Sequence, residues 1–256
     1  MFGFNLDKRT SYIVMAVLLV IAFSRFITSP GELLGLVLTA PAVLVAITFH
    51  EYAHAFVADK LGDDTPRRQG RLTLNPLAHL DPIGSVLLLV AGFGWGKPVE
   101  ISPRNFNRKH TMSAGEALVS VAGPLMNFVL AIVFSIVLAI TMKSLNIGIY
   151  QLNRIIMLMP TSITDIIITI LVSLVTINMA LGLFNLIPLP PLDGSKILKN
   201  FLPYNARNWY ESNEQILYMI FLVIWIMPIT SGYISDAIGV VAGGYMDLIL
   251  KLFGIS

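Results

Sequence analysis

Hydrophobic residues occur in long, almost unbroken runs along this chain, and shorter polar segments containing Gly and Pro separate the runs. A helix that crosses a hydrocarbon layer of about 30 Å needs about 20 apolar residues in succession. Six runs are near that length, so the pattern predicts an all-α polytopic membrane protein with six spans. The predicted spans are Tyr12–Ile27, Leu33–Val57, Ala117–Met142, Ile163–Ile187, Gln215–Ile229 and Ala237–Phe253.

The long segment between the second and third spans has a different pattern. Gly70–Asn75 and Pro98–Ile101 alternate between apolar and polar residues and are bounded by Gly and Pro, which is typical of short strands. Between them, Ile83–Val90 is apolar but too short to cross a membrane. We therefore expect a small membrane-associated β-sheet and a re-entrant element here.

Composition supports a membrane class and restricts the chemistry. The chain is 55% hydrophobic and 12% charged, whereas ordinary soluble domains are about 25% charged. It has no cysteine, which excludes disulfides and thiolate metal sites, so any metal must be held by His and carboxylate groups. We expect a single membrane-embedded domain over residues 1–256, with a core at about residues 33–200 and the other spans flanking it.

The distribution of basic residues predicts the orientation. Of 17 Lys and Arg residues, only Arg25, Lys143 and Arg154 lie on one predicted side of the membrane or at its boundary. Because cytoplasmic loops carry the excess of Lys and Arg, both termini are predicted in the cytoplasm of a multi-pass cell-membrane protein. The net charge of +2 gives no indication of nucleic-acid binding, and no nucleic-acid partner is expected.

A candidate metal motif, His50-Glu51-Tyr52-Ala53-His54, follows an apolar run in the second predicted span. Helix positions four apart differ by about 40° around the axis, so His50 and His54 project from one face, one turn apart. Glu51 lies beside that face, where a carboxylate can reach a metal-bound water without being a ligand. The alternative is a pair of packed histidines beside a surface glutamate, but burying three titratable groups without partners is costly.

A catalytic zinc usually has three protein ligands and one open position. Asp59 is turned about 140° to 180° away from the His pair on the same helix, and Asp63 and Asp64 follow a glycine in a polar turn where we expect solvated carboxylates. Asp193 is the better candidate, because three prolines within Asn185–Gly194 forbid a regular helix. Irregular backbone at membrane depth is tolerated where it lines a cavity or is buried in protein, so this segment and the His helix are predicted to share one pocket near the cytoplasmic side.

These two signatures, in this order, resemble those of the site-2 proteases, which are intramembrane zinc metalloproteases. The resemblance covers about Thr48 to Lys199. Supporting matches are Leu74–Gly84, Trp95–Val99 and Ala122–Asn127.

The resemblance implies one zinc ion per chain, held by His50, His54 and Asp193, with catalysis by Glu51 and help from Asn185. It implies a substrate that is itself a transmembrane protein in the bilayer, and a core of three helices with variable flanking spans. Such a substrate must unwind before it is cleaved, and Gly70–Asn75 is our candidate sheet edge for pairing with it.

Other polar residues have open or supporting roles. For His79 and His110 we expect surface positions or support of the site rather than ligation. For Asn127, tight packing, satisfaction of a helix break and substrate contact all stay open.

A rival hypothesis is a membrane zinc transporter or a non-proteolytic metal-binding scaffold. A conducting route needs polar or ionisable groups toward both membrane faces, whereas the predicted fifth span is almost wholly apolar and the candidate ligands gather at one side. This distribution favours the protease hypothesis over transport.

Overall fold

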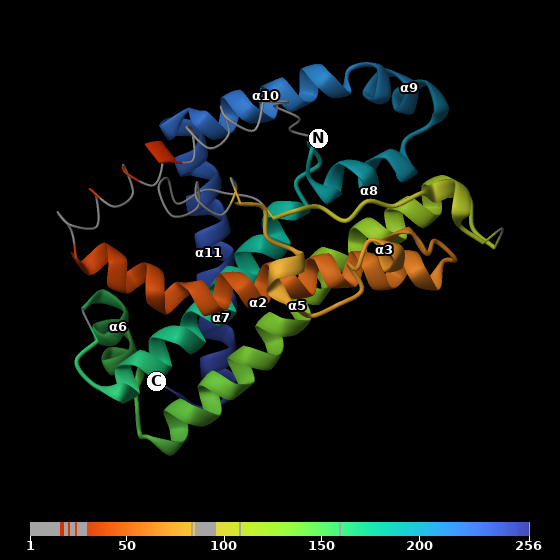
Figure 1. The fold of residues 1–256 in the computed structure, drawn as a ribbon. Helices are drawn as coiled ribbons and strands as arrows, with labels where there is room; N and C mark the ends of the chain where they lie inside the picture. The colour runs from red at the N-terminus through yellow and green to blue at the C-terminus, as the bar shows by residue number, and fades with distance from the viewer. Residues whose placement is uncertain are drawn as a thin grey trace.

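Four long helices form the frame of the protein (Figure 1). They are seen in a computed structural model that describes residues 16–17, 20, 24, 30–82, 84, 96–107, 109–158 and 160–255. Each of the four contains a stretch long and apolar enough to cross a membrane. The helices are α2 (Pro30–Lys60), α5 (Met112–Ser144), α7 (Ile163–Asn185) and α11 (Pro228–Leu252).

Shorter helical elements connect this frame. They are α3 (Thr65–Arg68), η1 (Pro76–Ala78), η2 (Pro103–Asn105), α6 (Ile149–Met157), α8 (Asp193–Phe201), α9 (Tyr204–Ser212) and α10 (Glu214–Ile226).

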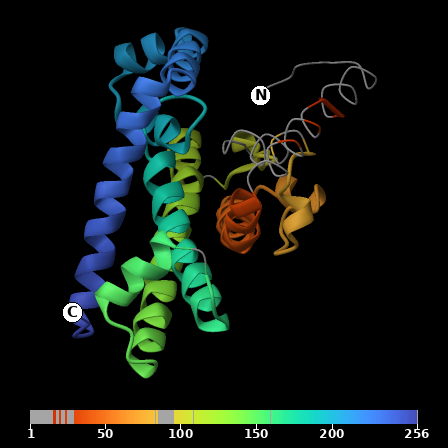
Figure 2. The same cartoon turned by 90° about the vertical axis from the view of Figure 1, so that its left-hand side faces the viewer.

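The helices pack in layers around a central pair. Helices α5 and α7 contact each other along their lengths, and α2 packs against both. In Figure 2, which looks nearly along α2, this helix lies on one side of α5 and α7, and α11 lies on the other. The segment after α2 covers the outer side of α2 in the same view. Helix α2 therefore lies between the central pair and the irregular polar segment.

The largest apolar cluster lies toward one end of the central pair. It joins the C-terminal half of α5 with α6, the N-terminal half of α7 and the end of α11. Its buried members are Leu138, Ala139, Met142, Leu152, Ile155, Ile168, Val175, Met246, Leu250 and Ile255. The other halves of α5 and α7 carry the buried amides Asn127 and Asn178, whereas the buried polar residues of the halves that join this cluster are the small Ser135 and Ser173. The bundle thus has a largely apolar end and a polar end.

The count of six spans is not confirmed. Four predicted spans correspond to α2, α5, α7 and α11, and Tyr12–Ile27 lies almost wholly outside the described residues. The predicted span Gln215–Ile229 is interrupted, because α10 has 13 residues and ends before Pro228 begins α11. Thirteen residues rise about 20 Å, which is short of a bilayer core of about 30 Å. Figure 1 shows the chain turning sharply from α10 into α11.

The predicted β-sheet is wrong for the residues that the structure describes. Neither Gly70–Asn75 nor Pro98–Ile101 forms a strand, and only an isolated antiparallel bridge joins Leu80 to Gly96. Side chains satisfy the backbone there instead. The buried Arg71 guanidinium donates to the carbonyl oxygens of Ala78 and Pro98. The expected substrate-pairing edge is thereby lost, and the expected re-entrant element at residues 83–90 falls almost entirely outside the described residues.

A buried carboxylate fastens the end of α2 to the segment before α5. Asp63 is fully buried, which corrects the expectation of a solvated side chain, whereas Asp64 is exposed. Asp63 Oδ2 accepts from the Ser102 N–H at 2.6 Å, and Oδ1 accepts from Thr65 and from Asn105. Burial opposes ionisation, but these hydrogen bonds outweigh it and hold the pKa of Asp63 below its ordinary value.

Candidate metal centre

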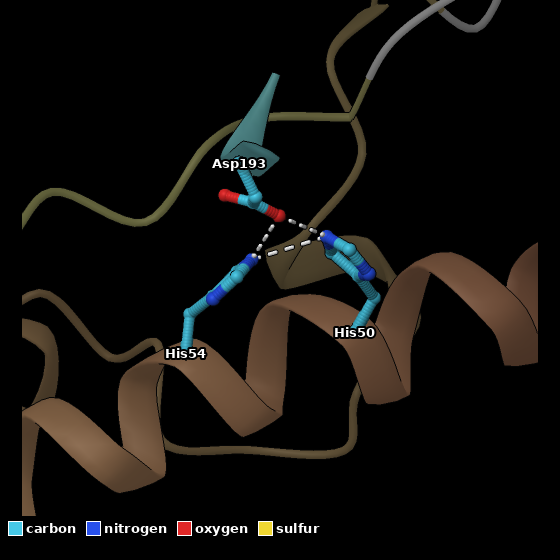
Figure 3. A group of neighbouring side chains, drawn as sticks. All are labelled: His50, His54 and Asp193. Atoms are coloured by element: carbon cyan, nitrogen blue, oxygen red, sulfur yellow. Dashed lines mark hydrogen bonds and ion pairs between the residues drawn. The ribbon is translucent and has the colours of Figure 1, made fainter. Parts of the chain in front are cut away.

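Three side chains from two segments distant in sequence converge at the polar end of the bundle. His50 and His54 project from one face of α2, and Asp193 points toward them from the start of α8 (Figure 3). The two Nε2 atoms lie 3.0 Å apart, and Asp193 Oδ2 lies 3.2 Å from His50 Nε2 and 3.1 Å from His54 Nε2. All three residues are buried.

The proton on each imidazole is placed by the partner of its other nitrogen. His50 Nδ1 lies 2.6 Å from Asn127 Oδ1, and His54 Nδ1 lies 2.7 Å from the carbonyl oxygen of Val119. An oxygen of this kind can only accept, so both Nδ1 atoms carry a hydrogen and donate it. In the neutral rings, both Nε2 atoms then present lone pairs to Asp193.

This donor set fits a divalent metal such as zinc. Among the described residues, Asp193 Oδ2 is buried without a hydrogen-bond partner. With both rings neutral, three electron-rich atoms at such distances repel one another unless a cation lies among them. Zinc bonds to His nitrogen and carboxylate oxygen are about 2.0–2.2 Å, which gives tetrahedral edges of about 3.3–3.6 Å. The observed separations of 3.0–3.2 Å are slightly shorter than such an edge, so a small outward movement of the three side chains would admit the ion. Three such ligands leave one position of a tetrahedron open.

The turn between α7 and α8 brings Asp193 to this point. Helix α7 ends at Asn185, and the prolines that follow prevent its continuation. Tyr210 of α9 holds the turn by donating its hydroxyl hydrogen to the Pro188 carbonyl at 2.9 Å. Gly194 lies against the carbonyl oxygens of Leu186 and Ile187, leaving no room for a Cβ atom. A side chain at this position would therefore push α8, and Asp193 with it, away from α7.

A second close approach occurs between the histidines and α5. A Cβ atom on Gly123 would lie 2.5 Å from His54 Nε2 and 2.6 Å from His50 Cε1. Only glycine lets α5 come so near to the metal-facing atoms of both rings. Because Val119 and Asn127 flank this glycine by one turn on either side, α5 supplies both the space and the hydrogen-bond acceptors.

A cavity of about 130 Å³ opens beside the three side chains, which is room for several waters. Glu51, Asn185 and Lys196 are among the residues that line it. Glu51 Oε2 accepts from the Val99 N–H at 3.0 Å. Asn185 Nδ2 donates one hydrogen to the Leu181 carbonyl at 3.0 Å. The structure thus brings both predicted catalytic residues to the cavity that adjoins the His and Asp side chains.

Other residues considered from sequence lie elsewhere. Asp59 forms a two-bond ion pair with Arg67, with Oδ2 2.7 Å from Nη2. His79 is buried rather than on the surface, and its Nε2 donates to the Thr73 carbonyl at 2.8 Å. His110 is exposed. None of the three belongs to the group that converges in Figure 3.

Two asparagines contribute more than the sequence indicated. From sequence, tight packing, satisfaction of a helix break and substrate contact all stay open for Asn127, and in the structure it contacts His50 directly. Asn178 was overlooked, yet it is fully buried and its Oδ1 accepts from Asn127 at 3.0 Å. The sequence does indicate an interhelical contact for Asn178, because an isolated amide within an apolar span usually bonds to a neighbouring helix.

Comparison with known proteins agrees with this geometry. The model of Peptidase family M50 matches residues 38–228. The chain belongs to this family, the site-2 proteases. It is 39% identical over 237 residues to YwhC of Bacillus subtilis, an inferred zinc metalloprotease, and the match covers 90% of this chain and 95% of YwhC.

The chain is also similar to Rip2 of Mycobacterium tuberculosis, likewise named as an inferred zinc metalloprotease. The chain is 27% identical to it over 193 residues, which are 74% of this chain and 67% of Rip2. No solved structure matches the chain significantly. Membership of the M50 family makes the chain a peptidase by class, and His50, His54 and Asp193 form a group in it that can hold zinc.

Replacement of Gly123 by alanine tests the close approach of α5. The added Cβ would displace both imidazoles, and we expect Gly123→Ala to bind zinc about 10- to 100-fold more weakly, as when the support of a ligand is lost. The measurement is zinc affinity by chelator competition. Gly243→Ala is the control, because its Cβ would meet nothing within 4 Å. Equal affinities in the two variants would show that the rings do not depend on this glycine.

Proposed function

We propose that this protein is an intramembrane zinc metalloprotease that hydrolyses peptide bonds within or near transmembrane segments of membrane proteins. One observation carries the proposal: three buried ligand atoms converge beside a cavity with room for several waters, toward the end of an apolar helix. His50, His54 and Asp193 would hold the metal. The family and the names of the relatives support the metalloprotease class.

Glu51 is the proposed general base. Zinc, when bound, lowers the pKa of a water toward about 7 and polarises a carbonyl. Glu51 lines the cavity beside the ligand group without belonging to it, so its carboxylate is free to take a proton from the attacking water and deliver it to the leaving amine. The Val99 N–H donates to one carboxylate oxygen. This bond limits the rotation of the side chain while the other oxygen accepts the proton.

Asn185 is the proposed support for charge on the substrate. Its amide nitrogen has two hydrogens, and the Leu181 carbonyl takes one of them. The second hydrogen is available to a substrate carbonyl in the cavity that Asn185 lines. Negative charge develops on that carbonyl oxygen as the peptide bond is attacked, and a side-chain donor aimed at it is worth several kcal/mol in comparable sites.

The depth of the site favours a substrate that comes from the bilayer. His50 is 17 residues beyond Leu33, where the candidate span begins, so it lies about 25 Å along the helix. That position is near one end of a hydrocarbon core of about 30 Å, close enough for water to enter. With the predicted orientation, the site lies toward the cytoplasm. The end of α11 packs with α6 and the C-terminal half of α5, at the end of the bundle opposite to the site, so the structure does not support the predicted cytoplasmic C-terminus.

The general-base role predicts a separation between binding and catalysis. Glu51→Gln keeps an oxygen that can accept from Val99 but cannot take a proton, so we expect normal zinc content and a rate about 10²- to 10⁴-fold lower. Cleavage of a single-span reporter protein in detergent, with zinc content measured on the same sample, gives both quantities. The control is Glu100→Gln, because Glu100 is exposed and bonded to Gln69.

The outcomes separate the rival classes. Loss of cleavage with zinc retained is the result expected of a protease. If the wild-type protein binds zinc but cleaves no membrane reporter, or if Glu51→Gln cleaves as fast as the wild type, the protease proposal fails. A transporter or a metal-binding scaffold is then the better description.

The orientation can be read with single cysteines, because the natural chain has none. Lys109 and Lys143 are exposed and lie near opposite ends of α5. In intact cells, a membrane-impermeant maleimide should label Lys143→Cys and reach Lys109→Cys only after the membrane is opened. The reverse pattern would contradict the predicted cytoplasmic location of the site.

A further inference from the structure

We propose that Asn178 of α7 is a positioning residue that selects the zinc-binding tautomer of His50, acting through Asn127. Asn178 contacts neither His50 nor Asp193 through any hydrogen bond of its own. Its influence passes through one intervening amide, that of Asn127. In each hydrogen bond between Asn178 and His50, only one of the two partners can be the donor. The inference rests on the proposed ligation of zinc by His50.

The donor and acceptor in each hydrogen bond are fixed starting from Asn178. Its Nδ2 donates to the Leu174 carbonyl, one turn earlier in α7, at 2.8 Å. A main-chain carbonyl can only accept, so the amide nitrogen must face Leu174 and the amide oxygen must face away from it. That oxygen accepts from Asn127 Nδ2 at 3.0 Å. The backbone of α7 thereby fixes Asn178 as an acceptor toward α5.

Asn127 is fixed by two acceptors on different helices. Its Nδ2 donates to Asn178 Oδ1 and also to the Ala46 carbonyl of α2, at 3.1 Å. Both amide hydrogens are used, and Oδ1 is left to face His50 Nδ1 at 2.6 Å. The Nδ1 hydrogen of His50 is the only hydrogen that can make this contact a hydrogen bond, so the lone pair lies at Nε2.

The opposite arrangement is unfavourable at every step. If Asn127 turned over, its NH₂ group would face His50 and move the ring proton to Nε2, where it would block the metal-facing lone pair. Its oxygen would then face the oxygens of Asn178 and Ala46, and two hydrogen bonds would be lost. Asn127 and Asn178 are each 0% exposed, so water cannot replace those bonds. The acceptor of Asn178 is therefore part of what keeps Asn127 in its metal-competent orientation.

The two histidines differ in this respect. His54 donates to the Val119 carbonyl, a main-chain group that needs no side chain to orient it. His50 depends on two side chains and on the register of α7 against α5. A change at residue 178 should therefore weaken the metal site through His50 alone and leave the contact of His54 unchanged.

The experiment measures zinc affinity of full-length protein in detergent by competition with a chelator. Asn178→Leu fills a similar volume but removes the acceptor, and we expect the zinc Kd to rise about 10- to 100-fold. In Asn178→Asp, the neutral carboxyl can donate to Leu174 and accept from Asn127, and we expect an affinity close to that of the wild type. Ser173→Ala is the control, because within the part of the chain that the structure describes, the buried Ser173 hydroxyl bonds only to the Thr169 carbonyl of its own helix.

A purely structural role for Asn178 predicts a different result. It would lower the thermal unfolding temperature of zinc-free Asn178→Leu and leave the Kd unchanged, which would overturn the inference. Equal losses of affinity in Asn178→Leu and Ser173→Ala would overturn it too. If Asn178→Leu does not fold, Asn178→Ala is measured in its place under the same criteria.

Failure of this inference is distinguishable from failure of the proposed function. If the wild type binds no zinc, or if His50→Ala binds it as tightly as the wild type, the proposed metal site is wrong. If zinc binding depends on His50 but Asn178→Leu retains the wild-type Kd, only the relay through the two asparagines is wrong.

Discussion

Repulsion among three buried, electron-rich atoms is the constraint on which the rest of the site depends. Two imidazole nitrogens and a carboxylate oxygen lie within 3.2 Å of one another. In neutral rings no hydrogen lies between them, because the one proton of each histidine is held on the opposite ring atom. In that protonation state, protein packing alone leaves the three atoms in repulsive contact. A bound cation reverses the sign of the interaction, so zinc binding and the packing of α2, α5 and α8 should stabilise one another.

Helix α5 organises this centre although it supplies no ligand. Gly123 makes room for both rings, while Val119 and Asn127 accept their Nδ1 hydrogens. The ligands come from α2 and from the first residue of α8, and α5 contacts both helices. A shift of α5 along either partner would therefore change ring position and ring tautomer together. The same packing brings the cavity-lining residues Glu51 and Asn185 to one side of the ligands.

Sequence reasoning succeeds here where one local rule dominates. Helical spacing alone brings His50 and His54 together, and the prolines before Asp193 were enough to predict an unwound segment that reaches them. The predicted sheet is wrong because an alternating pattern cannot show that a side chain will bond to the backbone in place of a strand partner, as Arg71 does. The prediction of one span over residues 215–229 is not confirmed, because a hydropathy average does not register the break at Pro228, where α11 begins after α10 has ended. Asn178 was missed because its role depends on which helices are neighbours.

X-ray absorption at the zinc edge of the purified protein tests the central claim most directly. The account predicts one zinc per chain, with scattering from two imidazole nitrogens at about 2.0–2.1 Å and from oxygen at about 2.0–2.2 Å. The imidazole scattering should fall or disappear in a His50→Ala and His54→Ala double variant. A protein that binds no zinc, or whose zinc keeps the same imidazole scattering in that variant, would contradict the metal centre described here.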